Sequence, residues 1–252
     1  KSSYKFSAAE SYFYNEFIYH NLNLIKNVFR SFVNAEFISA DRSNSKRSKS
    51  ILDEDDLSKL SRRYFSLNTG DRELVDAFLS GWIVEFGMAE EVIFYKDEDT
   101  ENYKIFIKKN NQKILLADMG FGVSQLLPIM LSCFPGNKIV AVEEPETNLH
   151  PALQSKLADF FIDAAAKFNI QFIIETHSEY LIRKLQYLTA KTDSNLETND
   201  TVIYYFFHPD KVPVGEDQVK KININGDGSL TDDFGSGFFD EADKIALELF
   251  LL

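Results

Sequence analysis

The stretch Asn137–Pro151 reads NKIVAVEEPETNLHP, and it decides the fold. Its apolar residues IVAV form a short run that is typical of a buried parallel strand. Two adjacent carboxylates, Glu143 and Glu144, follow at once, and Pro145 then ends the strand. An ionised carboxylate near an apolar layer is costly unless a cation or hydrogen-bond donors meet it. The pair therefore indicates a metal-phosphate site, and an ordinary solvated acidic turn is the competing interpretation.

Two other segments favour the metal-phosphate interpretation. Downstream, IQFIIETHSEYLIRKL contains a second apolar strand, residues 170–174, which runs into Glu175 and His177 before a helix capped by Ser178. Upstream, MGFGVSQLLPIML places the glycine-rich turn GFG directly before Ser124 at the start of a helix. Strand, helix, strand and helix in this order predict a right-handed parallel unit.

Together these segments resemble the C-terminal half of an ABC-type ATPase head of the OLD-like group of bacterial AAA ATPases. IVAVEEP resembles the Walker B strand, ETNLHP the D-loop, IIETHS the switch-histidine strand, and GFGVSQ a divergent ABC signature. The resemblance is close from Leu115 to Leu188, and FISADRSNSKR and GFFDEADK are similar to the same ATPases more weakly. It implies an α/β fold, a P-loop NTPase-like ABC ATPase head. Such a head has a parallel sheet flanked by helices, an antiparallel β meander and a helical subdomain.

The resemblance also implies roles for individual residues in ATP hydrolysis, with ATP and Mg²⁺ as the bound species. Glu144 would be the general base or the carboxylate that orients water, and Glu143 would support Mg²⁺. His177 would be the switch histidine at the γ-phosphate, where a buried structural histidine is the alternative. The nucleotide-contacting residues at the signature and the D-loop would be Gly120, Gly122, Ser124, Gln125, Asn148 and His150. In the signature, the main-chain N–H groups of a helix start suit an anion.

The sequence departs from the family pattern in three places. Glu143 stands where Asp is usual, and the extra methylene leaves open whether it meets Mg²⁺ directly or through water. GVSQ replaces SGGQ, so Ser124 leaves less room for close backbone approach than glycine would. The chain contains no G-x-x-x-x-G-K-[ST] phosphate loop (Walker A). We expect that loop, with the Q-loop, in a segment that precedes these 252 residues.

Composition restricts the class of protein. The 252 residues can bury a substantial core, and 44% hydrophobic with 26% charged residues is typical of a soluble globular protein. The formal net charge of -12 does not imply nucleic acid as a partner, which stays open. A single cysteine, Cys133, predicts a small core residue and a reducing cytoplasm. No apolar run is long enough to span a membrane.

Periodicity predicts three regions. Residues 1–90 are expected to form a helical subdomain with an inserted basic loop, residues 91–118 a β meander, and residues 119–252 the ATPase core. Expected helices cover 7–32, parts of 52–67, 71–86, 125–133, 148–168, 179–188 and 240–252. Expected strands begin at Ala35, in the meander, at 139 and 170, and in TVIYYFFHP and VKKININGDGSL. The basic residues from Arg42 to Lys49 could meet phosphates or nucleic acid, or form a solvated loop. Arg42 is singled out because it follows a strand end.

In the ABC arrangement, the signature of one head faces the nucleotide of another, so the resemblance implies a head-to-tail homodimer. It further implies an effector, for which a separate nuclease in bacterial antiphage defence is the candidate. Two rival functions remain open. A metal-dependent hydrolase or nuclease would use Glu143, Glu144, Glu146, His150 and His177 as direct ligands. A regulatory interaction module would bind ATP or a partner and hydrolyse poorly.

Overall fold

The computed structural model describes residues 35–42, 56–97, 102–136, 139–194, 196–235 and 237–251. These form two compact units. The first contains Lys1–Asn148 and Asp163–Thr176, and the second contains Leu149–Ile162 and His177–Leu252. The helix expected over 7–32 and the basic loop after Arg42 lie outside the described residues.

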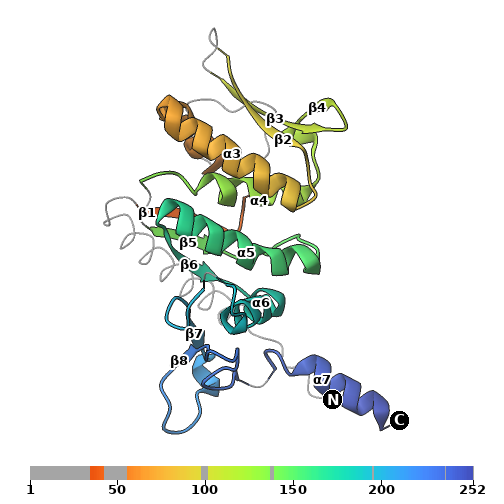
Figure 1. Ribbon diagram of the computed structural model, residues 1–252. Coiled ribbons are helices and arrows are strands. Elements are labelled where there is room, and N and C mark those ends of the chain that lie inside the picture. Colours follow the sequence, from red (N-terminus) through yellow and green to blue (C-terminus); the bar gives the residue numbers. More distant parts are fainter. Residues whose placement is uncertain are drawn as a thin grey trace, which may run out of the picture. The chain divides into compact units, whose positions relative to one another are not determined.

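A three-stranded parallel sheet carries the acidic stretch in the first unit. Its strands are β1 (Ala35–Ile38), β5 (Ile139–Glu143) and β6 (Gln171–Glu175), in the order β1-β5-β6 (Figure 1). Val142 is in register with Ile38 on one side and with Ile174 on the other. Because both pairings are parallel, the C-terminal ends of all three strands meet at one edge of the sheet. The adjacency of the two strands expected at 139 and 170 is confirmed.

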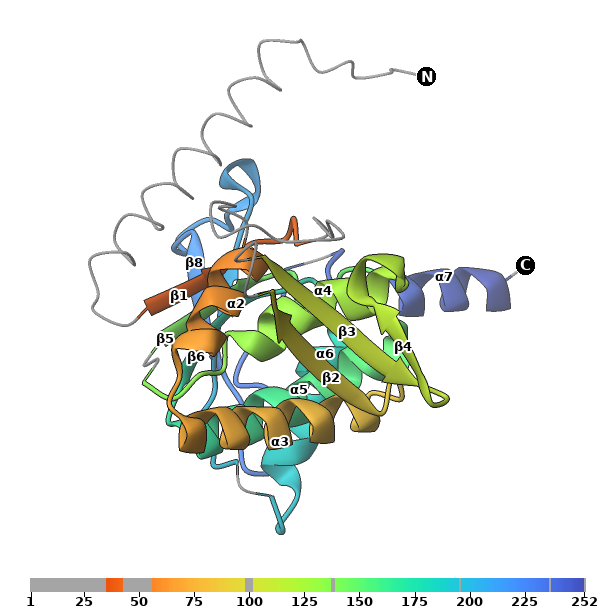
Figure 2. The same ribbon diagram turned by 90° about the horizontal axis from the view of Figure 1, so that it is seen from above.

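A separate antiparallel sheet forms the expected meander, which Figure 2 shows from above. It consists of β2 (Glu91–Lys96), β3 (Tyr103–Lys109) and β4 (Gln112–Leu115), in the order β2-β3-β4. The hairpin between β3 and β4 turns on Asn110 and Asn111, which have φ angles of 51° and 62°. Asparagine tolerates this left-handed conformation better than most residues, and two-residue hairpins of this kind require it.

Helices α2 (Asp56–Ser66) and α3 (Thr69–Glu85) precede the meander. The side chain of Asn68 accepts a hydrogen bond from the N–H of Asp71 and so caps α3. The buried residues of α3 recur at helical spacing: Val75, Phe78, Leu79 and Ile83. Leu74 is 38% exposed and lies at the margin of this buried face.

Helix α4 (Phe121–Leu131) follows the short 3₁₀ turn η1 (Leu116–Asp118) and differs from the expected helix 125–133. It begins four residues earlier, and Pro128 lies inside it. A proline there removes the N–H that would bond the carbonyl of Ser124. The helix persists because residues 123–131 are all buried, so packing outweighs the missing hydrogen bond.

Helix α5 (Pro151–Phe168) connects β5 to β6 and contributes to both units. Its proline start suits the first helical position, and the helix begins three residues later than expected. At its C-terminal end, within the first unit, Asp163 accepts a 2.7 Å hydrogen bond from Nε1 of Trp82. There the ring of Phe168 also packs edge-on against Phe78, with ring centroids 4.9 Å apart. These contacts fix the end of α5 against α3.

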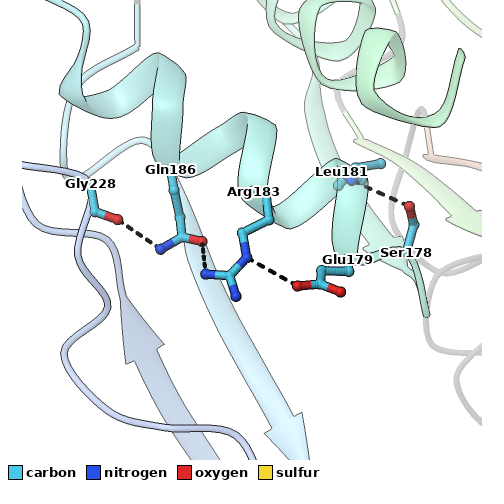
Figure 3. A network of polar contacts seen from close by, with 6 residues as sticks. All are labelled: Ser178, Glu179, Leu181, Arg183, Gln186 and Gly228. Atoms are coloured by element: carbon cyan, nitrogen blue, oxygen red, sulfur yellow. Dashed lines mark hydrogen bonds and ion pairs between the residues drawn. The ribbon is translucent and has the colours of Figure 1, made fainter. Parts of the chain in front are cut away.

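In the second unit, α6 (Glu179–Ala190) begins where expected. Ser178 caps it by accepting a hydrogen bond from the N–H of Leu181 (Figure 3). The antiparallel pair β7 (Val202–Phe206) and β8 (Val219–Asn223) follows, with the 3₁₀ turn η2 (Pro209–Lys211) between them. Tyr205 packs edge-on against both Phe234 and Phe238. The last helix, α7, covers Glu241–Phe250.

The expected fold class is confirmed: a mixed α/β chain with a parallel sheet, flanking helices and an antiparallel meander. Cys133 is 1% exposed, as expected for a core residue, and its burial raises the pKa of the thiol. Across the described residues, none of the helices is both long and apolar enough for a membrane span. The division into regions 1–90, 91–118 and 119–252 stays a prediction.

Candidate active site

The acidic residues after β5 form a tight turn at the sheet edge, and we call Glu143–Thr147 the acidic turn. Glu143 is the last residue of β5 and is in register with Glu175, the last residue of β6. The main-chain N–H of Thr147 donates to the carbonyl of Glu144 at 3.1 Å, which closes the turn. The parallel sheet therefore places three carboxylates, those of Glu143, Glu144 and Glu175, at the ends of two neighbouring strands.

Glu144 adopts a backbone conformation that is costly for a residue other than glycine. Its φ is 40°, in the left-handed region. Such a residue persists only when its surroundings hold it, and the cost is of order 1–3 kcal/mol. Here the N–H of Glu144 donates to the main-chain oxygen of Glu175 at 2.9 Å and to its Oε2 at 3.2 Å. Strain at a site of this kind motivates a functional hypothesis.

The side chain of Glu144 is held as well as its main chain. Thr147 Oγ1 donates a 2.8 Å hydrogen bond to Oε2 of Glu144. Carboxylate oxygens of Glu144 and Glu175 lie within 4.8 Å of each other. The threonine leaves the other oxygen of Glu144 available to a water molecule or a cation, and the half-buried position limits competition from bulk solvent.

Glu143 has one oxygen occupied and one available. Its Oε2 accepts a 3.1 Å hydrogen bond from the N–H of Ala40, just after β1. Its Oε1 is buried and finds no hydrogen-bond donor in the part of the chain that the structure describes. A buried carboxylate oxygen without a donor is costly, and a divalent cation or its bound water would remove that cost. Glu143 therefore fits the Mg²⁺-supporting role that the sequence predicts.

Arg42 joins the acidic turn to the rest of the first unit. It is 4% exposed, and its guanidinium donates to four main-chain carbonyls. Two of these carbonyls belong to Glu143 and Glu144, and the others to Ser39 and Gln125. The guanidinium thus connects the end of β1, the acidic turn and α4.

The signature residues lie at the start of α4. Gly120 is the N-cap and makes no side-chain cap hydrogen bond, so main-chain N–H groups begin the helix there. Gly122 is partly exposed, whereas Ser124 and Gln125 are only 5% and 3% exposed. Gln125 Oε1 is also buried without a donor among the described residues. The accessible part of this helix start is therefore the glycine turn, with Ser124 beneath it.

The D-loop residues and the switch histidine occupy strand and helix boundaries. Asn148 is exposed and has a φ of 62°. His150 is exposed, and its Nδ1 accepts a 3.3 Å hydrogen bond from the N–H of Ala152 at the start of α5. His177 is exposed and follows Glu175 by two positions, where the second unit begins. The roles predicted for these three residues stay predictions.

Thr147 and Glu175 were given no role from the sequence, and Arg42 was singled out only because it follows a strand end. Thr147 and Glu175 hold Glu144, and Arg42 holds the carbonyls of the acidic turn. The position of Thr147, three residues after Glu144, is the local spacing at which a hydroxyl reaches back in a turn. Glu175 ends a strand, which is a second signal that the sequence carried. The partners of Arg42 are far away in sequence and left no local signal.

Comparison with known families settles the broad identity. The family model of the AAA ATPase domain matches residues 4–182, which is most of the chain and includes every predicted site residue. The chain belongs to the AAA ATPase domain family. This membership makes the chain an ATPase domain of the P-loop type and identifies a nucleotide as its ligand class. The acidic turn of the AAA ATPase domain is accordingly its candidate hydrolytic centre.

The C-terminal part of this AAA ATPase domain protein matches another family model. Residues 196–249 match a family described as a protein of unknown function, DUF3696. That segment contains β7, β8 and α7 except for its last residue. No curated protein matches the chain.

Two solved structures of SMC proteins are similar to the chain. The first is described as "Structural biochemistry of ATP-driven dimerization and DNA stimulated activation of SMC ATPases". It is 12% identical with a TM-score of 0.44, over 76% of this chain and 96% of that one. The second is the Smc head domain with an extended coiled coil bound to the C-terminal domain of ScpA, derived from Pyrococcus furiosus. It is 13% identical with a TM-score of 0.39, over 71% of this chain and 38% of that one.

Proposed function

We propose that this chain is the ATP-hydrolysing head of an ABC-type ATPase that works as a nucleotide-clamped dimer. The observation that carries the proposal is the fixed carboxylate of Glu144 at the shared edge of β5 and β6. Its main chain is held in a costly conformation by Glu175, and its carboxylate by Thr147. A turn that served only to reverse the chain would not need the side chain held as well.

Each residue would have a distinct part in the reaction. In-line attack on a γ-phosphate needs an oriented water molecule, charge neutralisation and donors to the phosphoryl oxygens. Glu144 would accept a hydrogen bond from the attacking water and take up its proton, and His177 would donate to the γ-phosphate. Glu143 would hold Mg²⁺ directly or through water with its available Oε1. When bound, Mg²⁺ supplies charge neutralisation at the phosphate oxygens.

The clamped dimer follows from the signature residues. The glycine turn at Gly120 and Gly122 would meet the nucleotide held by a second copy, with Ser124 and Gln125 supporting it. Asn148 and His150 would lie along the seam between the copies. No G-x-x-x-x-G-K-[ST] motif is present in the 252 residues. We propose that another segment of the same protein supplies the phosphate loop.

The substitution Glu144→Gln in the full-length protein tests this proposal. It keeps the shape of the side chain but removes the negative charge, so ATP turnover should fall by about 100-fold or more. The ATP-bound dimer should persist, which light scattering with ATP and Mg²⁺ can measure. Glu91→Gln, which removes an exposed carboxylate of β2 outside the acidic turn, is the control and should leave turnover near the wild-type rate. Unchanged turnover in Glu144→Gln would remove Glu144 from the mechanism.

The output of the ATPase is a finer proposal that depends on the family resemblance. We propose that closing of the dimer licenses an effector, with a nuclease in antiphage defence as the first candidate. Cells that carry the wild-type protein and its genetic neighbours should survive phage challenge better than cells with Glu144→Gln. Equal survival would exclude a defence role that depends on hydrolysis.

A directly ligated metal site is the second candidate function. It is favoured by the carboxylate oxygens of Glu144 and Glu175 within 4.8 Å, a spacing that two ligands of one ion can have. In that case the purified protein should retain a transition metal and cleave a phosphodiester without ATP. Glu146→Gln should then lose metal as well as activity. A metal-free protein that turns over ATP with added Mg²⁺ would decide against this candidate.

A further inference from the structure

The buried arginine Arg42 lies four positions beyond β1. Each of the four hydrogen bonds described above for its guanidinium has a main-chain oxygen as the acceptor. Nη1 donates to the carbonyls of Ser39, at 2.8 Å, and Glu143, and Nη2 donates to the carbonyl of Glu144 at 2.6 Å. Nε donates to the carbonyl of Gln125 at 3.2 Å. Arg42 is only 4% exposed, and burying a charged side chain costs free energy. A charged residue at this position therefore needs a structural or functional reason.

The geometry of the guanidinium suits two successive carbonyls. Its donors lie in one rigid plane, so bonds from Nη1 and Nη2 fix the carbonyls of Glu143 and Glu144 relative to each other. These two carbonyls flank the φ of Glu144, which is the strained angle of the acidic turn. The direction in which the Glu144 side chain leaves the main chain therefore depends on Arg42.

The bond from Nε of Arg42 reaches a different element, α4. Gln125 lies in the second turn of α4, and the glycines of the signature lie at the N-cap and in the first turn of this helix. One rigid side chain thus contacts both α4 and the acidic turn. A displacement of α4 relative to β5 would strain the bonds to Glu143 and Glu144.

We propose that Arg42 is a positioning residue that sets the direction of the Glu144 carboxylate. Through Arg42, this direction depends on the position of α4 relative to the acidic turn. This inference rests on the proposed ATPase function. It assigns Arg42 no contact with ATP. Because α4 would meet the nucleotide of a second copy, the guanidinium offers a direct mechanical connection from dimer closure to the hydrolytic carboxylate.

The conservative substitution Arg42→Lys tests the inference in the full-length protein. Lysine keeps the positive charge but has a single nitrogen, so it cannot hold two carbonyls at a fixed spacing. A small misplacement of a catalytic group can cost about 100-fold in rate, so kcat for ATP should fall by roughly 10- to 100-fold. KM should change by less than about threefold, because ATP binding does not use this side chain.

Arg63→Lys is the matched control. Arg63 is in the same unit and forms a 3.5 Å ion pair with Glu36 of β1, and its guanidinium lies over the ring of Phe134. The two contacts described here are to β1 and to Phe134, and neither is to the acidic turn. Its substitution should lower thermal stability slightly and leave kcat unchanged per folded molecule.

The readout that separates positioning from simple stabilisation is kcat per folded molecule. The folded fraction is measured by circular dichroism at the assay temperature. A lower kcat with an unchanged KM in folded Arg42→Lys supports the inference. A wild-type kcat in folded Arg42→Lys overturns it and leaves the proposed function intact.

Two further outcomes are decisive. If Arg42→Lys does not fold, Arg42→Gln is measured in the same way, and failure of both to fold would assign Arg42 to stability alone and overturn the inference. A wild-type protein that does not hydrolyse ATP overturns the proposed function first, and the inference about Arg42 with it.

Discussion

Thr147 Oγ1 donates a 2.8 Å hydrogen bond to Oε2 of Glu144, three residues earlier in the chain. The hydroxyl thereby selects one orientation of the carboxylate while leaving its second oxygen available. Glu144 itself has a φ of 40°, so both its main chain and its side chain are restrained. This pair is the most specific feature of the acidic turn and provides the first prediction.

Removal of the Thr147 hydroxyl should slow hydrolysis without unfolding the protein. Thr147→Val keeps the β-branched shape but cannot donate, so the Glu144 carboxylate gains rotational freedom. If the loss of this hydrogen bond raises the activation free energy by about 1.4 kcal/mol, kcat falls roughly tenfold. Thr147→Ser retains the donor and should keep most of the activity, which steady-state ATP assays of both variants can check. Equal rates for the two variants would show that the hydroxyl does not orient Glu144.

The Trp82–Asp163 hydrogen bond should stabilise the first unit measurably. Trp82 Nε1 donates to Oδ2 of Asp163 at 2.7 Å, which joins α3 to the end of α5. A double-mutant cycle with Trp82→Phe and Asp163→Ala should give a coupling free energy of unfolding of about 1 kcal/mol, since the pair is exposed. Chemical denaturation measures it. A coupling free energy near zero would mean that the bond contributes nothing in solution.

The buried thiol of Cys133 should make the protein less stable at alkaline pH. Burial raises the pKa of this thiol from its ordinary value of 9.0. As the pH rises past the ordinary value, the unfolded chain releases the proton while the folded chain keeps it. The free energy of unfolding should therefore fall by up to about 1.4 kcal/mol per pH unit.

Cys133→Ala is the control for this pH dependence. The alanine variant starts less stable because a buried atom is lost, but it should lack the part of the alkaline slope due to the thiol. Urea unfolding from about pH 8 to about pH 10, a range that spans the ordinary thiol pKa, gives the slope of unfolding free energy against pH for each protein. Parallel slopes for the two proteins would show that the thiol is not the group that titrates.

Gly228 should tolerate no side chain, unlike Gly226 two residues earlier. Gly228 has a φ of 82°, and a Cβ there would lie 2.8 Å from the main-chain oxygen of Gln186. Its own carbonyl accepts a 2.8 Å hydrogen bond from Gln186 Nε2, as Figure 3 shows. Gly228→Ala should lower the free energy of unfolding of the second unit by about 1–3 kcal/mol.

Gly226→Ala is the matched substitution. A Cβ at Gly226 would lie 3.7 Å from Thr198 Cγ2, an ordinary contact, and no left-handed φ is required there. It should cost less than about 1 kcal/mol. Thermal melts of both variants provide the comparison, and equal losses would contradict the close approach to α6.

Much of the fold could be predicted because its signals are local. The run IVAV and the apolar residues from 170 to 174 each predict a buried strand, and the structure pairs them in parallel. Asn68 and Ser178 cap helices with short-range hydrogen bonds. The predicted start of α4 was wrong. Pro128 is a strong local signal against a helix around it, whereas the burial of its neighbours, which keeps the helix intact, is a tertiary effect.

The sequence alone determined where the acids and the histidine stand relative to the two buried strands. Adjacent acids at the end of an apolar run, and a histidine after the next one, are recognisable without coordinates because strand burial and turn formation depend on near neighbours. Tertiary structure alone decided how those acids are held. Arg42 reaches the carbonyls of Glu143 and Glu144 from about a hundred positions away, at separations of 101 and 102 residues. A hydrogen bond depends on distance and direction in space, and folding, not spacing along the chain, brings such partners together.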